Sequence, residues 1–215
     1  MSLEIEKRFK IFDYNKIKKQ FKKLEIKKVR GILFKLAVYK SPKDKMTVRI
    51  RDEGVKITFT IKQNKGGDKI YDTEYEVVVD NYDMMDQMIQ LLGLEKLYDL
   101  HKYREIYKTK NNKTEIIFDH FPGLPPYMEV ESKTEKELKS VIKKLGLNDE
   151  ANFTAKDLYF EQYGITKERK DTSLNFTNAD KMLDNFITNN KEQFNIILKH
   201  QNKFLNKKVK QIYIA

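Results

Sequence analysis

The chain has 215 residues, no cysteine and a formal net charge of +11. The lack of cysteine excludes disulfides, thiolate zinc sites and cysteine nucleophiles, and the three histidines show no recognised zinc-binding spacing, so a metal would have to bind to oxygen. No run approaches the about 20 apolar residues that cross a bilayer, and the N-terminus is charged where a signal peptide is apolar. We therefore expect one main domain of a soluble, cytoplasmic protein with no membrane partner, and the positive charge indicates an anionic ligand.

The first predicted element is a strand over residues 3–11. Side chains alternate between the two faces of a strand, so Glu4, Glu6 and Arg8 share one face and apolar residues occupy the other. Carboxylates two residues apart on one face repel each other. The pattern therefore indicates a cationic group opposite this face, although a polar face in contact with water would give the same pattern.

The rest of the chain divides into predicted strands and helices. Further strands are expected at residues 32–39, 46–51, 56–62, 71–79, 100–109, 114–121 and 127–132. Helices are expected at residues 13–24, 81–92, 134–145, 178–189 and 191–209. Asp13 is expected to cap the first helix and Gly31 to precede a strand. Met84, Met85 and Met88 are expected to pack in the core.

Charged side chains that share a strand face are nearly pure in sign. Basic faces carry Arg49 and Arg51, Lys62, and Lys102 and Arg104, whereas acidic faces carry Glu74 and Glu76, Glu115 and Asp119, and Glu129 and Glu131. If the sheet closes into a barrel, the apolar faces pack outward against three helices and the charged faces line a common lumen. Carboxylate pairs bind hard divalent cations and arginines bind phosphate oxygens, so a metal-bound oligophosphate fits both signs. The alternative is a set of internal salt bridges between acidic and basic strands.

The order of these motifs resembles the CYTH superfamily of triphosphate tunnel metalloenzymes over residues 1–163. The resemblance rests on Glu4-Ile5-Glu6-Lys7-Arg8, the VRIR and TIK strands at 48–51 and 60–62, EYE at 74–76, KYR at 102–104, IFD at 117–119 and EVE at 129–131. The opening signature of the family is ExExK, and this chain has Arg8 at the position of the lysine. Positive charge is kept, but the compact ammonium becomes a planar fork.

The resemblance implies an α+β fold, an eight-stranded antiparallel β-barrel with helices packed outside. Residues 1–170 would form the tunnel-barrel domain and residues 171–215 a C-terminal helical extension packed on it, with a partner surface or a cover over one tunnel mouth as alternatives. By resemblance, Mg²⁺ or Mn²⁺ would be held by Glu4, Glu6, Glu129 and Glu131. The substrate would be held by Arg49, Arg51, Lys62, Lys102 and Arg104. Catalysis would depend on Glu4, Glu6, Arg8 and Lys62, with Glu74, Glu76, Glu115 and Asp119 as further tunnel-lining residues.

Members of the family include class IV adenylyl cyclases, thiamine triphosphatases, inorganic tripolyphosphatases and RNA 5′-triphosphatases. The favoured hypothesis is a metal-dependent triphosphatase acting on a small triphosphate, because the charged residues account for phosphates and metal only. One alternative is a cyclase that makes cyclic AMP and pyrophosphate from ATP, although no stretch indicates an adenine pocket. Another is a non-catalytic module that binds polyphosphate or an RNA 5′-triphosphate end. No DNA partner is expected, and both a monomer and a homodimer remain open.

Overall fold

The structure is a computed structural model that describes residues 5–10, 13–41, 46–64, 72–148, 150, 152–166 and 173–212. Eight antiparallel strands form one curved sheet in the order β1-β8-β7-β6-β2-β3-β4-β5, and a short ninth strand runs parallel to β6. The strands are β1 (Ile5–Lys10), β2 (Lys27–Tyr39), β3 (Met46–Asp52), β4 (Ile57–Asn64), β5 (Asp72–Val79), β6 (Lys96–Lys108), β7 (Thr114–His120), β8 (Tyr127–Ser132) and β9 (Ser173–Leu174). The helices are α1 (Tyr14–Lys23), α2 (Tyr82–Leu91), α3 (Glu135–Leu145), α4 (Ala155–Tyr163), α5 (Ala179–Leu183) and α6 (Lys191–Ile212).

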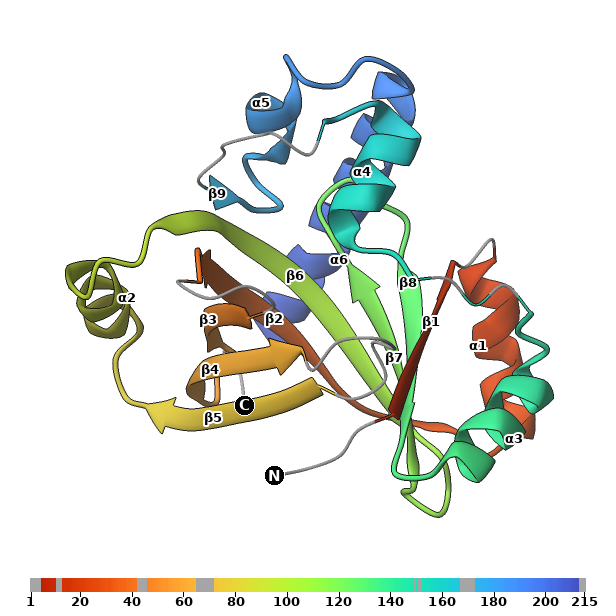
Figure 1. Ribbon diagram of the computed structural model, residues 1–215. Helices are drawn as coiled ribbons and strands as arrows, with labels where there is room; N and C mark the ends of the chain where they lie inside the picture. The colour runs from red at the N-terminus through yellow and green to blue at the C-terminus, as the bar shows by residue number, and fades with distance from the viewer. Residues whose placement is uncertain are drawn as a thin grey trace.

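The predicted α+β architecture is confirmed. The sheet has eight antiparallel strands and curves strongly, with helices outside it (Figure 1). β1 and β5 form its two ends, and no ladder of hydrogen bonds joins them within the described part of the chain, so the barrel is not closed in this way. The curvature still directs the charged strand faces toward one shared interior.

Helices α1 and α3 cover the outer face of the sheet near β1, β7 and β8 (Figure 1). Phe21 of α1 and Leu138 of α3 are buried against Phe118, Met128 and other outward-facing side chains of these strands. The sequence marks both helices correctly, because the Asp13 side chain accepts a hydrogen bond from the first turn of α1, and α3 ends at a glycine in the left-handed conformation. This half of the sheet therefore has the expected outer apolar layer.

Helix α2 corrects one prediction about the core. Met84 and Met88 are 59% and 52% exposed, and only Met85 packs against the apolar cluster there. The helix contacts the sheet at β3, and its buried residues are Tyr82 and Ile89, so only a narrow side of the helix is covered. Helical spacing predicts which side of a helix is apolar, but not how wide a surface its neighbours cover.

The outer face near β5 also differs from the expectation of helical cover. Tyr75 and Val77 of β5 are both more than half exposed. Since β5 is the last strand of the sheet and α2 lies beyond its C-terminal end, no described helix packs over these two side chains.

A third group of elements gathers at one end of the sheet: α4, β9, α5 and α6 (Figure 1). The prediction of a helix from residue 191 is confirmed, whereas α5 is much shorter than the expected 178–189, and α4 was not expected. Phe194, Leu198 and Leu205 of α6 are buried in a cluster with Phe121 and Tyr127 of the barrel. The C-terminal helix therefore packs on the barrel, while the division into residues 1–170 and 171–215 stays a prediction.

Two strands begin earlier than expected. β2 starts at Lys27 and passes through Gly31, where a Cβ atom would lie 2.0 Å from the Tyr103 hydroxyl oxygen, so glycine permits a close approach within the strand. β6 starts at Lys96, which pairs with Tyr39. Neither extension has a local sequence signal, because each depends on a partner strand. Among the described helices, none combines the length and the hydrophobicity that a membrane span needs.

Candidate active site

The interior of the sheet holds a compact group of paired charges. Arg104 donates to Asp119 through Nε at 2.7 Å and Nη2 at 2.6 Å, and its Nη2 also donates to Glu129 at 2.8 Å. Lys102 donates to Asp119 at 2.7 Å. Arg8 donates to Glu129 through Nε at 2.8 Å. The register of β1, β8, β7 and β6 therefore brings together three cations and two carboxylates from four neighbouring strands.

Burial determines how these charges behave. Asp119 is fully buried and Glu129 is 3% exposed. Burial alone would raise the pKa of Asp119, but Arg104 and Lys102 outweigh it and hold that pKa well below its usual range. Burial and the neighbouring Arg104 lower the pKa of Lys102 to about 8, although Asp119 acts in the opposite direction. At this end of the group, the two positive charges of Lys102 and Arg104 therefore exceed the single negative charge of Asp119.

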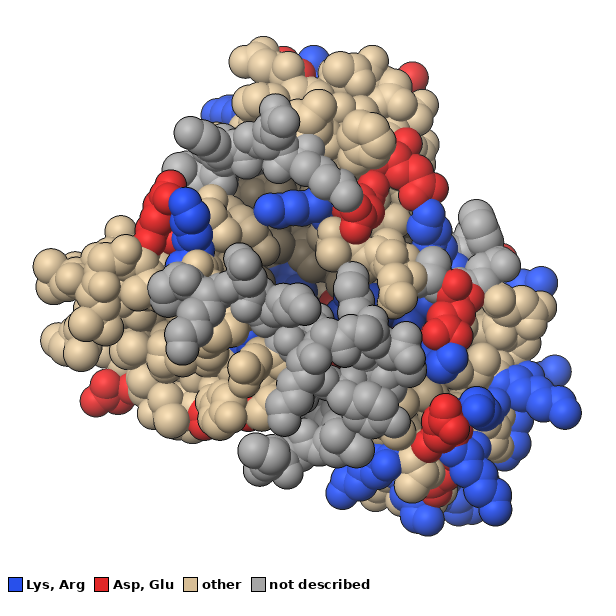
Figure 2. Space-filling view, viewed as in Figure 1, with Lys and Arg blue, Asp and Glu red and all other residues tan. Residues whose placement is uncertain are grey.

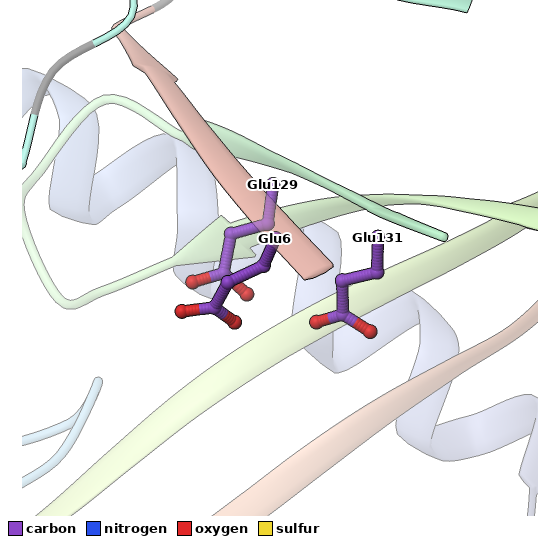
Figure 3. A group of neighbouring side chains, drawn as sticks. All are labelled: Glu6, Glu129 and Glu131. Atoms are coloured by element: carbon purple, nitrogen blue, oxygen red, sulfur yellow. The ribbon is translucent and has the colours of Figure 1, made fainter. Parts of the chain in front are cut away.

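Next to this group, three carboxylates converge. Glu6 of β1 and Glu129 and Glu131 of β8 each offer an oxygen, and these atoms lie within 4.8 Å of one another (Figure 3). Glu6 pairs directly across from Glu131, and Glu131 pairs directly across from Glu115 of β7. Three acidic residues therefore stand side by side on three adjacent strands, where like charges repel. Arg8 pairs with Glu6 at 2.9 Å and Lys108 with Glu115 at 2.8 Å, which offsets part of this repulsion.

A second wall of the interior comes from β3, β4 and β5. Arg49 contacts Glu74 and Arg51 contacts Glu76, both at 3.4 Å, and Arg51 also pairs with Glu53 at 2.9 Å. The Nε atoms of both arginines are buried and have no hydrogen-bond acceptor in the part of the chain that the structure describes. Burial and Arg49 together lower the pKa of Arg51. Buried guanidinium donors without an acceptor are a structural reason to expect an anion here.

Lys62 and its neighbours lie further along the same wall. Lys62 forms an ion pair with Glu74 at 3.2 Å. Glu76 also pairs with Lys56 at 3.2 Å, and its pKa is lowered, since burial is outweighed by Lys56 and Arg51. The structure therefore places Lys62, Glu74 and Glu76 on the inner face as expected, in ion pairs between basic and acidic strands.

Phe34 is a site residue that the sequence did not reveal. Its buried ring on β2 lies under three cationic groups: Arg51 and Lys102 at 5.4 Å from the ring centre and Arg104 at 5.8 Å. The face of an aromatic ring attracts cations and offsets part of their mutual repulsion. The ring thus joins the two walls into one cationic surface. Its only sequence signal was an apolar position on a strand, which is also the signal of any core residue.

The interior is less uniformly charged than predicted. Ile32, Phe34, Ile106 and Ile117 form an apolar cluster on inward strand faces. Glu115 lies beyond this cluster from Asp119 and pairs with Lys108 at 2.8 Å. Asp119, expected only as a lining residue, is instead at the centre of the charged group, and Glu4 lies outside the described residues. The interior therefore has an apolar stretch between its charged groups.

The CYTH domain family model matches residues 2–161, the part of the chain that contains the eight antiparallel strands and most of α4. The chain belongs to the CYTH family. A relative from Methanocaldococcus jannaschii, named "Putative adenylate cyclase MJ0240", is 31% identical over 180 residues, which are 76% of this chain and 99% of the relative. Members of the family are enzymes, either triphosphatases or adenylate cyclase-like, and its triphosphate tunnel enzymes use divalent metal ions.

Solved structures confirm the fold of this CYTH chain. The PH1012 protein of Pyrococcus horikoshii superposes with a TM-score of 0.64 at 21% identity, covering 72% of this chain and 98% of that one. A Hippeastrum protein, described as a putative adenylyl cyclase with a dominant triphosphatase activity, has a TM-score of 0.50 at 14% identity, covering 75% and 95% of the two chains. At these identities the likeness concerns the fold alone.

The donor chemistry of the acidic group fits a divalent ion. Its ligands would all be carboxylate oxygens, which suit hard ions such as Mg²⁺ and Mn²⁺. The facing pair Glu6 and Glu131 gives a physical reason for a cation, because two carboxylates opposite each other on adjacent strands repel. Glu129 and Glu6 also accept hydrogen bonds from Arg8, so the arginine fixes their orientation.

Proposed function

We propose that this chain is a metal-dependent triphosphatase that binds a triphosphate inside the curved sheet. The observation that carries the proposal is the row of carboxylates across β1, β8 and β7 beside the partly buried cations Arg8, Lys102 and Arg104. A bound cation alone would pair only with the carboxylates, and a bound anion alone would pair only with the cationic side chains. A triphosphate with a divalent ion suits both, because the ion takes the carboxylates and the phosphate oxygens take the cations.

In this proposal the cations bind and orient the substrate. Lys102, Arg104 and Arg51 surround the Phe34 ring and bind phosphate oxygens from one side, and Arg8 binds from the side of β1. Arg49 extends this surface along β3, and Lys62 stays a predicted contact on β4. Arginine donates through a planar fork that matches two phosphate oxygens, so the substrate is held in a fixed orientation.

The carboxylates hold the metal and assist the attack of water. Glu6, Glu129 and Glu131 would hold the ion, with Glu4 as a further predicted ligand. A divalent ion in this position supplies positive charge to the phosphate oxygens and acidity to a water molecule. Arg8 keeps Glu6 and Glu129 oriented, and the arginines and Lys102 stabilise the charge that develops on the phosphate being transferred.

A second candidate is a cyclase that forms cyclic AMP and pyrophosphate from ATP. The M. jannaschii relative favours this candidate, because its name is that of an adenylate cyclase and the two chains align over nearly its whole length. In a cyclase the ribose 3′-hydroxyl replaces water, so the nucleoside must be held in line with the α-phosphorus.

The deciding experiment is a substrate panel. The purified chain is incubated with tripolyphosphate, ATP, GTP and thiamine triphosphate in the presence of Mg²⁺ or Mn²⁺. Phosphate, pyrophosphate and cyclic nucleotide are then measured separately. Metal-dependent release of phosphate supports the triphosphatase, whereas equal amounts of cyclic nucleotide and pyrophosphate support the cyclase. Absence of every product from the whole panel contradicts both.

A further inference from the structure

A cavity of about 500 Å³ adjoins the cationic group at one end of the barrel interior. It lies between the strands β2 and β6 and the elements α4 and β9, and both Arg8 and Lys102 line it. Figure 2 shows this face of the molecule hollowed between the helical group and the sheet, with Lys or Arg side chains at the rim and inside. Its volume is within the range of about 300–1,000 Å³ that small-molecule sites occupy.

The floor of the cavity changes from apolar to cationic along a single strand face. Tyr98, Leu100, Lys102 and Arg104 alternate on β6 and therefore point to the same side. Tyr98, Leu100 and Lys102 all line the cavity. Neighbours on such a face are about 7 Å apart. A ligand that extends along β6 would thus place an anionic group at Lys102 and Arg104 and an apolar group beside Leu100.

The apolar region of the floor is accessible within the cavity. Leu36 of β2 pairs with Leu100 of β6, and both side chains line the cavity and are only partly buried. Leucine side chains that face the lumen next to three cations add nothing to the binding of an inorganic polyphosphate. They do favour a ligand with an apolar surface, because covering such surface stabilises the complex by roughly 25 cal/mol per Å².

The roof comes partly from segments beyond the family match. The cavity is lined from above by Tyr159 of α4, by Ile165 in the segment after α4, and by Leu174 of β9. Leu174 pairs with Leu100, so roof and floor are joined through the parallel ladder between β9 and β6. Ile165 and Leu174 lie beyond the residues 2–161 that the CYTH model matches. The family resemblance alone therefore does not account for this cavity.

The roof is held in place by buried hydrogen bonds. Tyr159 donates its hydroxyl to the Pro122 carbonyl at 2.6 Å, and Tyr163 donates to the Gly123 carbonyl at 2.5 Å. Gln201 of α6 donates to two carbonyls of the same turn and accepts from its Gly123 amide. Helix α6 thus braces the turn that positions α4. A cavity formed in advance costs a ligand little ordering free energy on binding.

From this arrangement we infer that the cavity binds the organic group of a triphosphate ester, and that this group is flat and aromatic, such as a nucleobase. The inference rests on the proposed binding of triphosphate at Lys102 and Arg104. Tyr98 and Tyr159 offer aromatic surface to a planar group. Lys156, whose Nζ lies 4.6 Å from the centre of the Tyr98 ring, stands at the mouth with Thr154 and can bind polar edges of that group.

The test compares organic and inorganic triphosphates in variants that fill the cavity. Leu100→Trp and, separately, Leu36→Trp place an indole in the cavity from two different strands. Leu97→Trp is the matched control, because Leu97 lies on the same strand, is 41% exposed and does not line the cavity. Values of kcat and KM are measured for tripolyphosphate, ATP, GTP and thiamine triphosphate, and calorimetry gives Kd for each with and without Mg²⁺. Circular dichroism confirms that each variant is folded.

Wild type should bind at least one organic triphosphate more tightly than tripolyphosphate. The cavity variants should lower kcat/KM for that ester at least tenfold, mainly through KM, and change tripolyphosphate less than twofold. Leu97→Trp should leave kcat/KM unchanged for both the ester and tripolyphosphate. Equal losses for both substrates in the folded variants, or an organic triphosphate that binds no better than tripolyphosphate, would overturn the inference and leave the triphosphatase proposal intact. If no triphosphate is hydrolysed, the proposed function fails, and the Kd values still decide the inference.

Discussion

Replacing Asp119 by Asn should destabilise the protein strongly, because Asp119 is the buried anion between two cations. The side chains of Lys102 and Arg104 are only 12% and 15% exposed, and both donate to this carboxylate. Asn keeps one acceptor oxygen but removes the charge, so Lys102 loses its ion-pair partner and Arg104 keeps only its pair with Glu129. Breaking a buried ion pair typically costs about 3–5 kcal/mol, and we expect about 3 because one hydrogen bond can remain. For a chain of this size that corresponds to a fall in Tm of about 6–12 °C.

The same substitution should have a defined pH dependence. The pKa of Asp119 in the folded state is lowered, so its stabilising contribution is present above the unfolded pKa of about 3.9 and is lost as the pH falls below it. The difference in Tm between wild type and Asp119→Asn should therefore be large at pH 7 and should shrink toward pH 3. Thermal unfolding followed by circular dichroism at several pH values measures this difference.

Glu115→Gln is the control, because Glu115 lies on the same strand face but is 35% exposed in its pair with Lys108. It should cost less than about 1 kcal/mol. A difference below about 2 °C for Asp119→Asn at pH 7, or one that does not shrink in acid, would refute the view of Asp119 as the central counter-ion.

Three further predictions concern ligands. Glu6→Gln should abolish metal-dependent turnover with little change in Tm, since it removes one ligand charge and also relieves repulsion with Glu131. Glu135→Gln on α3 is the control and should leave turnover unchanged. Turnover of Glu6→Gln within twofold of wild type would exclude the metal role of Glu6. Tripolyphosphate with Mg²⁺ at a hundredfold excess over Kd should stabilise the fold by about 2.7 kcal/mol, seen as a thermal shift of several degrees. The shift should shrink above pH 8, because the pKa of Lys102 is about 8 in the free protein, and Lys102→Met should lack this decline. ATP with Mn²⁺ should yield mainly ADP and phosphate by chromatography, and dominant cyclic AMP and pyrophosphate would contradict the hydrolase.

The inward strand faces could be predicted because alternation is a local property. Glu6 and Arg8, Lys102 and Arg104, and Glu129 all lie on the concave side, whichever strands they pair with. The depth of each residue was not predictable in this way. Glu115 and Asp119 occupy equivalent positions in the pattern of β7, but only Asp119 is opposite Arg104. That register is set by the pairing of distant strands, which no local pattern contains.

Helix α4 and the cavity were missed for different reasons. Helix α4 buries Leu158, Tyr159 and Tyr163 while Phe160 is 54% exposed, so its apolar residues do not form one stripe with helical spacing. Its capping box at Thr154 was the available signal. The cavity has no signal in any one segment, because its walls come from β2, β6, α4 and β9, which are far apart in sequence. Its apolar lining residues resemble ordinary core residues when they are considered separately.

Under the proposed function, the ion pairs inside the sheet explain how one interior would suit both components of a metal-bound triphosphate. Arg8 is paired with Glu129, and Arg51 with Glu76, so opposite charges neutralise each other in the protein described here. A triphosphate alone could take the cations, but it would leave the released carboxylates facing one another. A divalent ion alone could take the carboxylates, but it would leave buried cations unpaired, which is costly. The metal–triphosphate complex replaces both partners of each pair that opens, so the mixed charge of the interior favours the complex over either ion alone.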